Sequence, residues 1–217
     1  MDINSYYKKK LYPLQDKVLK ILDKLKSPFY LTGGTALSRC YFNHRYSDDL
    51  DLFLNDNPKF RANSEKIIKE LKKIFKVQII TKADKYYSLQ IDKKLKIDLI
   101  NDVASYIGKT KKTPIYSKVD NPVNIFSNKI SALISRDEPK DVVDIWIISK
   151  NQKIDWEQIF IDTSSKAIGI FPPTVAQKLD TFPIDLIDKI NWVKNNKPAK
   201  NLFKTDMQKL ILDILKI

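Results

Sequence analysis

The stretch LTGGTALSRCYFNHRYSDDLDLFL, residues 31–54, contains two adjacent glycines, Gly33 and Gly34, and three aspartates within four positions. In its last six residues the leucines alternate with other side chains, so all three leucines share one face of an extended segment. Asp49 and Asp51 share the opposite face. The pattern predicts a strand with one apolar face and one carboxylate face.

Two carboxylates on one strand face repel each other when both are ionised. At about 4 Å the repulsion is roughly 1 kcal/mol in water and about 4 kcal/mol at an effective dielectric of 20. A hard divalent cation such as Mg²⁺ accepts oxygen ligands and removes the repulsion. With one histidine and one cysteine in the chain, a Cys/His zinc cluster is excluded. The alternative is that both aspartates face solvent on an edge strand and pair with lysines.

The glycine pair follows a short apolar segment and precedes a segment without helix breakers. Adjacent glycines let the backbone approach a phosphate closely, and the N–H groups of the following helix, with the Thr35 hydroxyl, can bind an anion. A tight turn without a ligand is the alternative interpretation of the same pair.

Hydrophobic periodicity indicates an α+β protein in which a mixed sheet with flanking helices is followed by a C-terminal helical bundle. We expect a catalytic α/β domain over residues 1–120 and a helical domain over 121–217 that completes the substrate cleft. The expected helices are Pro13–Leu25, 35–42, 64–75, 124–135, 140–149, 155–166, 174–194 with a break at Pro183, and 201–216, and the expected strands are 28–32, 49–54, 77–81, 86–91 and 95–100.

The composition is that of a folded basic protein: 43% of the 217 residues are hydrophobic, 30% are charged, and the formal net charge is +13. Between Lys59 and Lys96 there are twelve basic and four acidic residues, a net charge of +8, and GKTKK follows at 108–112. This clustering favours a polyanionic partner such as nucleic acid or a nucleoside triphosphate. Lysines spread over a solvated surface are the alternative.

The sequence also bears on location. It contains no run of about 18 uncharged apolar residues, and its first residues, MDINSYYKKKLYP, lack the apolar segment of a secretory signal. A single cysteine, Cys40, cannot form a disulfide within the chain. We therefore expect a cytoplasmic protein that does not enter a membrane.

GGTAL followed by RYSDDLDLF resembles the motif of the nucleotidyltransferase superfamily, and more narrowly that of the AbiEii (MenT-type) toxin family. The family signature is G-G-T-A-L and then R-x-S-x-D-L-D-L-F. A second similarity, NKISALISRDEPKDVVDIW, lies in the helical half, so that the resemblance spans residues 29–148. The matching residues are Gly33, Gly34, Thr35, Ala36, Leu37, Arg45, Ser47, Asp49, Leu50, Asp51, Leu52 and Phe53, and then Lys129, Arg136, Lys140, Asp141 and Asp144.

The resemblance implies that Asp49 and Asp51 bind Mg²⁺ (or Mn²⁺) against a nucleoside triphosphate. A third carboxylate on a neighbouring strand then binds the metal or deprotonates the attacking hydroxyl. We assign this role to Asp98, because strand alternation places it opposite Leu95, Ile97 and Leu99. The alternative is a surface aspartate beside Lys96.

The remaining motif residues have implied roles in binding the nucleotide. Gly33, Gly34 and Thr35 form the phosphate cradle, Arg45 braces the aspartates or contacts phosphate, and Ser47 caps the turn into the strand. Lys129 is expected to bind the triphosphate. Asp141 and Asp144 are expected to orient Lys129 or to contact the nucleotide, with a salt bridge between helices as the alternative. We expect the three tryptophans, Trp146, Trp156 and Trp192, to be packing residues; base-stacking platforms are the alternative.

Together these features predict transfer of a nucleoside monophosphate from an NTP to an acceptor hydroxyl, with release of pyrophosphate. The resemblance implies that the acceptor is the 3′ end of tRNA or another RNA, and that the protein is the toxin of a toxin–antitoxin or abortive-infection system, controlled by a cognate antitoxin. Nucleotidylation of a protein or small molecule, and a non-catalytic basic RNA-binding module, are the alternatives. The role of Asp48, directly before the aspartate pair, is left open.

Overall fold

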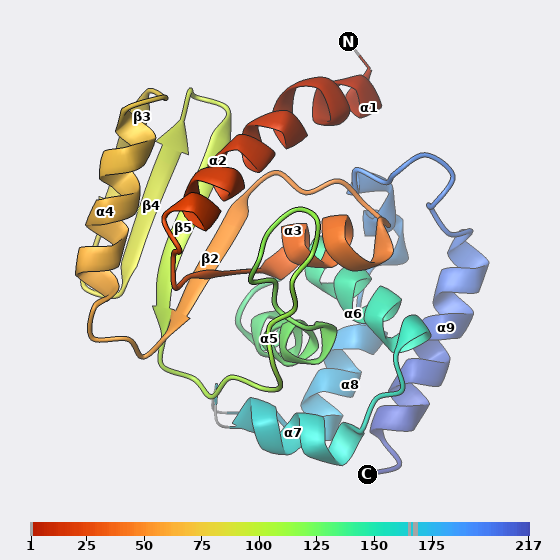
Figure 1. Cartoon of the computed structure of the whole chain (residues 1–217). Coiled ribbons are helices and arrows are strands. Elements are labelled where there is room, and N and C mark those ends of the chain that lie inside the picture. Colours follow the sequence, from red (N-terminus) through yellow and green to blue (C-terminus); the bar gives the residue numbers. More distant parts are fainter. Residues whose placement is uncertain (1, 165, 167–168) are drawn as a thin grey trace. The chain divides into compact units, whose positions relative to one another are not determined.

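The computed structural model of the chain describes residues 2–164, 166 and 169–217 (Figure 1). The chain folds into two compact units. Unit 1 comprises Met1–Ala104 and Lys109–Asn121, and unit 2 comprises Ser105–Gly108 and Pro122–Ile217. Within the described residues, none of the helices has both the length and the apolar character required to cross a bilayer.

Unit 1 is built on a five-stranded sheet with the order β1-β2-β5-β4-β3. The β2 and β5 strands are parallel and the other neighbouring pairs are antiparallel, so the sheet is mixed as predicted. Its elements are α1 (Ile3–Tyr6), η1 (Tyr7–Leu11), α2 (Tyr12–Lys24), β1 (Tyr30–Thr32), α3 (Gly33–Leu37), η2 (Ser38–Phe42), β2 (Leu50–Asn55), α4 (Phe60–Lys72), β3 (Val77–Lys82), β4 (Tyr86–Ile91) and β5 (Leu95–Asp102).

One face of this sheet forms the core of unit 1. Along β2, buried leucines alternate with partly exposed residues, which is the predicted pattern. The β5 residues Ile97 and Leu99 pair with Leu50 and Leu52 and are fully buried on the same face. Phe60 of α4 packs edge-on against Tyr87 of β4 with the ring centroids 5.4 Å apart, and Figure 1 shows α2 and α4 over this face. The opposite face is therefore the one that presents the aspartates.

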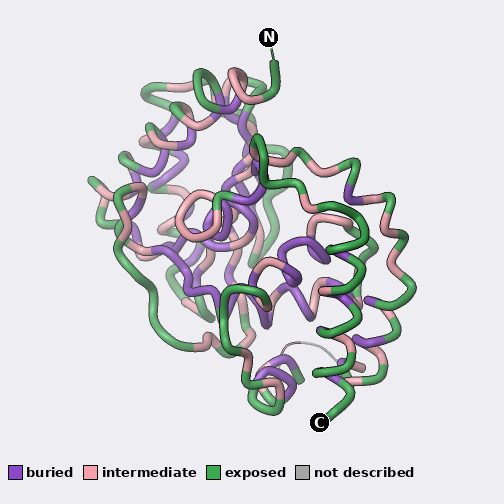
Figure 2. The backbone as a smooth tube through the Cα atoms, turned by 90° about the vertical axis from the view of Figure 1, so that its right-hand side faces the viewer, coloured by how far each residue is buried: buried purple, intermediate pink, exposed green. Residues whose placement is uncertain are grey.

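Unit 2 is helical and consists of α5 (Pro122–Ser135), α6 (Pro139–Asn151), α7 (Trp156–Ser164), α8 (Pro172–Asp180), η3 (Ile184–Lys189) and α9 (Lys200–Ile214). Its core includes Trp146, whose ring lies 5.3 Å from that of Phe203 and 6.2 Å from that of Trp192. In Figure 2 the buried residues follow the inward sides of the helices and the exposed ones their outer turns.

Several predicted boundaries differ from the structure. The break expected at Pro183 is confirmed, because Pro183 has an extended backbone and lacks an N–H donor; the first helix ends at Asp180, and a 3₁₀ helix, Ile184–Lys189, replaces the expected continuation to 194. The helix expected over 155–166 ends at Ser164, and residue 165 lies outside the described residues. The short helix expected over 35–42 begins earlier, at Gly33 itself.

Candidate active site

A row of polar residues crosses four neighbouring strands on the face opposite the core of unit 1. In the sheet register, Thr32 pairs with Asp51, Asp51 with Asp98, and Asp98 with Ser88. Side chains of directly paired residues lie on the same face of a sheet. Asp98 is thus the direct cross-strand neighbour of Asp51. A third carboxylate of the site has to lie on a strand next to that of Asp51, and Asp98 does.

Asp98 is held by three side chains. The Ser88 hydroxyl donates to its Oδ1 over 2.7 Å, the Tyr86 hydroxyl donates to the same oxygen over 3.1 Å, and the Lys96 ammonium lies 2.7 Å from Oδ2. Only 8% of Asp98 is exposed, so it is not a surface aspartate, although the predicted neighbour Lys96 does bind it. Burial lowers the pKa of Lys96, but the hydrogen bond and charge of Asp98 raise it, and the net shift is upward.

The two glycines make room for side chains of the site. Gly33 has φ +68°, and a Cβ atom at this position would come closer than 3.0 Å to Oδ2 of Asp51. A Cβ atom on Gly34 would overlap the Arg45 guanidinium and lie 3.0 Å from the Ser47 hydroxyl. The sequence suggested glycine for the approach of a phosphate; the structure adds that glycine permits the approach of these three side chains.

The segment before β2 is fixed by hydrogen bonds from buried hydroxyl groups. Thr35 donates to the Asp49 carbonyl, and Ser38 donates to the Arg45 carbonyl. Arg45 is buried and donates from Nη1 to the Tyr46 carbonyl over 3.0 Å. Thr35 is fully buried, so in this structure its hydroxyl positions Asp49. Its expected contact with a phosphate stays a prediction.

The N-terminal helical segment holds the residues on either side of this turn. The Tyr7 hydroxyl donates to Oδ1 of Asp48 over 2.6 Å. The Gln15 side-chain amide donates to the Asp48 carbonyl over 2.9 Å and to the Ser47 carbonyl over 3.2 Å. The Asp48 carboxylate therefore binds the N-terminal segment, and this contact is the role that the sequence left open for Asp48.

His44 is buried beside Phe42, with the ring centroids 6.4 Å apart.

Unit 2 contains the second set of motif residues as a buried charge cluster. The Lys129 ammonium lies 2.6 Å from Oδ1 of Asp141 and 2.7 Å from Oδ2 of Asp144. The Arg136 Nε atom lies 2.7 Å from Oδ2 of Asp141. Both carboxylates are fully buried and the Lys129 side chain is 8% exposed, whereas the Arg136 side chain is 51% exposed.

The alternative role, a salt bridge between helices, is present in the structure, because Lys129 is in α5 and both aspartates are in α6. Asp141 binds Lys129 and Arg136 and has no exposed surface, so it orients these cations and a nucleotide cannot reach it without rearrangement. Burial raises the pKa of Asp141, but the charges and hydrogen bonds of Lys129 and Arg136 lower it, and the net shift is downward. Its expected part in nucleotide binding is therefore indirect and stays a prediction.

The residues of unit 1 offer oxygen donors of the kind a hard divalent cation binds. Asp51 and Asp98 are adjacent on parallel strands, and Asp49 precedes Asp51 by two residues. Among the described residues, however, no group of three or more His, Cys, Asp or Glu side chains is close enough to hold a metal ion. The Lys96 ammonium neutralises Oδ2 of Asp98 in this arrangement. The donor chemistry fits Mg²⁺, and the three-carboxylate site stays a prediction.

Sequence reasoning did not identify Ser88, Tyr86 or Gln15 as parts of the site. The signal for Ser88 was present, because the hairpin turn after Ile91 pairs Ile91 with Leu95 and, three residues further from the turn on each strand, Ser88 with Asp98. Gln15 lies in a helix far away in sequence, and no local pattern indicates its contact.

Comparison with known proteins shows the family of the chain. The family model described as nucleotidyl transferase AbiEii toxin, of type IV toxin–antitoxin systems, matches residues 18–209. No curated protein matches the chain.

Solved structures with a similar fold include that of a nucleotidyltransferase toxin. MenT4, a nucleotidyltransferase toxin from Mycobacterium tuberculosis H37Rv, superposes with a TM-score of 0.62 at 12% identity, covering 100% of this chain and 86% of that one. JHP933 from Helicobacter pylori gives 0.58 at 16% identity over 100% and 94%. The antibiotic-resistance factor ANT(2″)-Ia gives 0.56 at 13% identity over 73% and 91%. The match over residues 18–209 shows that the chain belongs to the AbiEii family of nucleotidyltransferase toxins.

Proposed function

We propose that this nucleotidyltransferase uses Mg²⁺ to transfer a nucleoside monophosphate from an NTP to the 3′ hydroxyl of an RNA, with tRNA as the first candidate. It would act in the cytoplasm as a toxin that a cognate antitoxin controls. The family description, which names a type IV toxin–antitoxin system, supports the toxin role and the antitoxin. The observation on which the chemistry depends is the pairing of Asp51 with Asp98 beside the glycine turn.

Asp49, Asp51 and Asp98 are the residues that would hold the divalent cation, through carboxylate oxygens. Bound there, Mg²⁺ (or Mn²⁺) offsets the negative charge of the triphosphate and of the transition state. The Asp51 carboxylate packs against Gly33. The Thr35 hydroxyl donates to the Asp49 carbonyl and so holds the backbone of Asp49.

Asp98 is the residue that accepts the proton of the attacking hydroxyl. The hydroxyl oxygen forms a bond to the α-phosphorus, the bond to the pyrophosphate oxygen breaks, and pyrophosphate leaves. Ser88 and Tyr86 both bind Oδ1 of Asp98, which holds the carboxylate in one orientation and directs Oδ2 away from them. Lys96 at Oδ2 must move for that oxygen to accept the proton.

The triphosphate is expected to contact the backbone at Gly33 and Gly34, with Arg45 and Ser47 behind the turn. Lys129 is the further proposed ligand of the triphosphate, and it would have to leave Asp141 or Asp144, which bind its ammonium in the structure. A lysine ammonium is a point charge suited to a flexible phosphate chain.

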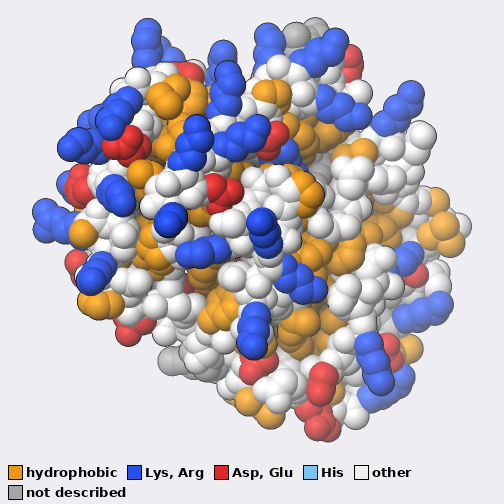
Figure 3. Space-filling model, in the orientation of Figure 1, with side chains coloured by type: hydrophobic (Ala, Val, Ile, Leu, Met, Phe, Trp, Pro, Cys, Tyr) orange, Lys and Arg blue, Asp and Glu red, His pale blue; other side chains and the backbone are white. Residues whose placement is uncertain are grey.

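The charge of the protein supports an RNA acceptor. In Figure 3, Lys and Arg side chains are spread over much of the face shown, with fewer acidic side chains among them. Unit 1 contributes the basic stretch from Lys59 to Lys96. A surface of this sign attracts a phosphate backbone without regard to base sequence.

The test is incubation of the protein with each α-³²P-labelled NTP in turn and with total RNA, total protein or an aminoglycoside. We expect label in RNA only, in the presence of Mg²⁺. Asp49→Asn should abolish it, whereas Asp48→Asn, in which the adjacent carboxylate bound by Tyr7 is neutralised, should retain it. Label in protein or drug alone would contradict the RNA acceptor, and transfer by Asp49→Asn would contradict the site.

A further inference from the structure

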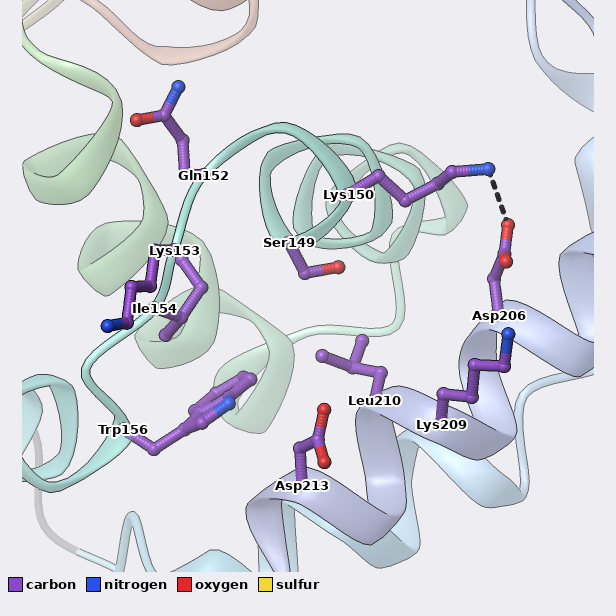
Figure 4. A pocket seen from close by; sticks show the side chains of 10 residues that line it. All are labelled: Ser149, Lys150, Gln152, Lys153, Ile154, Trp156, Asp206, Lys209, Leu210 and Asp213. Atoms are coloured by element: carbon purple, nitrogen blue, oxygen red, sulfur yellow. Dashed lines mark hydrogen bonds and ion pairs between the residues drawn. The ribbon is translucent and has the colours of Figure 1, made fainter.

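A pocket of about 520 Å³ lies wholly within unit 2, between the end of α6, the segment that leads into α7, and one side of α9 (Figure 4). Its volume is within the range of small-ligand sites. None of the residues predicted for catalysis or nucleotide binding lines it. The lining residues are Ser149, Lys150, Gln152, Lys153, Ile154, Trp156, Asp206, Lys209, Leu210 and Asp213.

The inner wall combines a flat aromatic surface with hydrogen-bond acceptors. Figure 4 shows the Trp156 indole, with Ile154 and Leu210 at the sides of the pocket. The Ser149 hydroxyl and the Asp213 carboxylate point toward the centre. A flat ligand with polar N–H groups fits such a wall, because it can stack on the indole and donate to these oxygens.

Trp156 differs from the other two tryptophans in the surroundings of its indole ring. The Trp146 indole N–H donates to Asp206, and the Trp192 indole N–H donates to the Ile187 carbonyl. Trp156 packs edge-on against Phe126 with the ring centroids 5.4 Å apart, and it also lines the pocket. The prediction that all three tryptophans only pack is therefore incomplete for Trp156.

Lysines surround the rim of the pocket. The Lys150 ammonium donates to Asp206 over 2.7 Å and lies 5.0 Å from the centroid of the Trp146 ring, so it is engaged. In the part of the chain that the structure describes, neither Lys153 nor Lys209 forms an ion pair. Figure 4 shows their ammonium groups on opposite sides of the pocket, Lys153 beside Ile154 and Lys209 on α9.

We propose that this pocket binds one nucleotide of a single-stranded nucleic acid, with the base stacked on Trp156 and the flanking phosphates on Lys153 and Lys209. Aromatic platforms between lysines are a general means of binding single strands with little sequence preference. Cations on both sides of the indole suit a nucleotide inside a chain, which has a phosphate on either side of its base. The inference concerns binding by unit 2 alone and does not depend on the identity of the acceptor in catalysis.

The test measures binding of a short fluorescent single-stranded RNA to the full-length protein by anisotropy. Trp156→Leu should raise the dissociation constant about 5- to 150-fold. Lys153→Ala and Lys209→Ala should each weaken binding and lower the salt-dependence slope by about 0.7. Lys204→Ala, an exposed lysine of α9 that does not line the pocket, is the matched control and should change binding less than Lys209→Ala.

A second measurement covers the case in which Trp156→Leu unfolds. An RNA with 5-iodouridine, cross-linked by light to the unmodified protein, should form its cross-link with Trp156. Cross-links found only outside the pocket, or equal effects of Lys204→Ala and Lys209→Ala, would overturn the proposal. Binding of polyphosphate or of an acidic peptide with the same dissociation constant as the RNA would also overturn it. Binding is measured without NTP or Mg²⁺, conditions under which transfer cannot occur, so a failure of the proposed catalysis is distinguishable from a failure of this site.

Discussion

Replacement of Lys129 by methionine removes the only charge of this side chain while keeping most of its volume. In the structure the Lys129 ammonium lies within 2.7 Å of two carboxylates that have no exposed surface, and its own side chain is 8% exposed. After the substitution Asp141 still has Arg136, but Asp144 loses the Lys129 charge. The consequence is a buried carboxylate with reduced compensation.

The magnitude follows from this burial. Removing one partner of a buried ion pair costs about 3–5 kcal/mol, since the remaining charge is poorly solvated. That is a large part of the roughly 5–15 kcal/mol by which domains are stable. Neutralising the second partner as well, in Lys129→Met/Asp144→Asn, should restore part of the loss, and with Asp144→Asn measured alone the double-mutant cycle gives the coupling between the two residues.

The pH dependence of the free energy of unfolding is a second, independent test of the buried charge cluster. Because the pKa of Asp141 is lower in the folded protein than the usual value of about 3.9, its contribution to stability is fully present above about pH 4. It is lost as the pH falls through the lower pKa of the folded state. Lys129→Met removes one cause of that shift, so the variant should lose less stability than the parent over this acidic range.

The assay is urea denaturation followed by tryptophan fluorescence. All three tryptophans, Trp146, Trp156 and Trp192, belong to unit 2, so the signal reports the unit that contains the cluster. The control is Lys178→Met, whose partner Asp137 lies 2.9 Å away with its side chain 87% exposed; this surface pair should contribute at most about 1 kcal/mol. A loss for Lys129→Met no greater than that of the control would refute the reasoning.

Two further substitutions test the geometry of unit 1. Gly33→Ala should lower the free energy of unfolding by more than the roughly 1–2 kcal/mol of a left-handed backbone, because the new Cβ overlaps the carboxylate of Asp51. Gly169→Ala is the control, since Gly169 has φ +85° with open space around it and should show the backbone cost alone. Both variants are compared by thermal denaturation and by transfer assays. Ser88→Ala removes a hydrogen bond to the charged carboxylate of Asp98, which is worth about 1.5–3 kcal/mol. It should lower kcat about tenfold or more with little change in KM for the NTP. An unchanged kcat would show that Ser88 does not position Asp98.

The sequence was sufficient for the parts of the fold that depend on local pattern. Alternation in β2 assigned Asp51 to the polar face, and alternation in β5 did the same for Asp98, although the parallel pairing of these two strands was not predicted. The bounds of β4 were predicted correctly because the turn residues Asp92 and Lys93 end the strand pattern; both adopt positive φ in the structure.

The parts that local pattern could not predict depend on tertiary contacts. The Asp48 carboxylate binds Tyr7, which is 41 residues away in sequence. The need for glycine at position 34 arises from Arg45 and Ser47 and not from the turn alone. The break at Pro183 was predicted correctly, but the segment after it is a short 3₁₀ helix and not the expected α-helix to 194. The packing predicted for Trp156 is present, but the pocket beside it was not predicted, because α9, about 50 residues later, forms one of its walls.

The central claim is that Asp51 and Asp98, adjacent on parallel strands, bind a divalent cation together with the nucleotide. The most direct measurement is electron paramagnetic resonance of Mn²⁺ titrated with the protein in the presence of a non-hydrolysable NTP analogue. The account predicts that the parent and Asp48→Asn bind Mn²⁺ with similar affinity, and that Asp51→Asn/Asp98→Asn binds it at least about tenfold more weakly. Equal Mn²⁺ affinity in the double variant and the parent would contradict it.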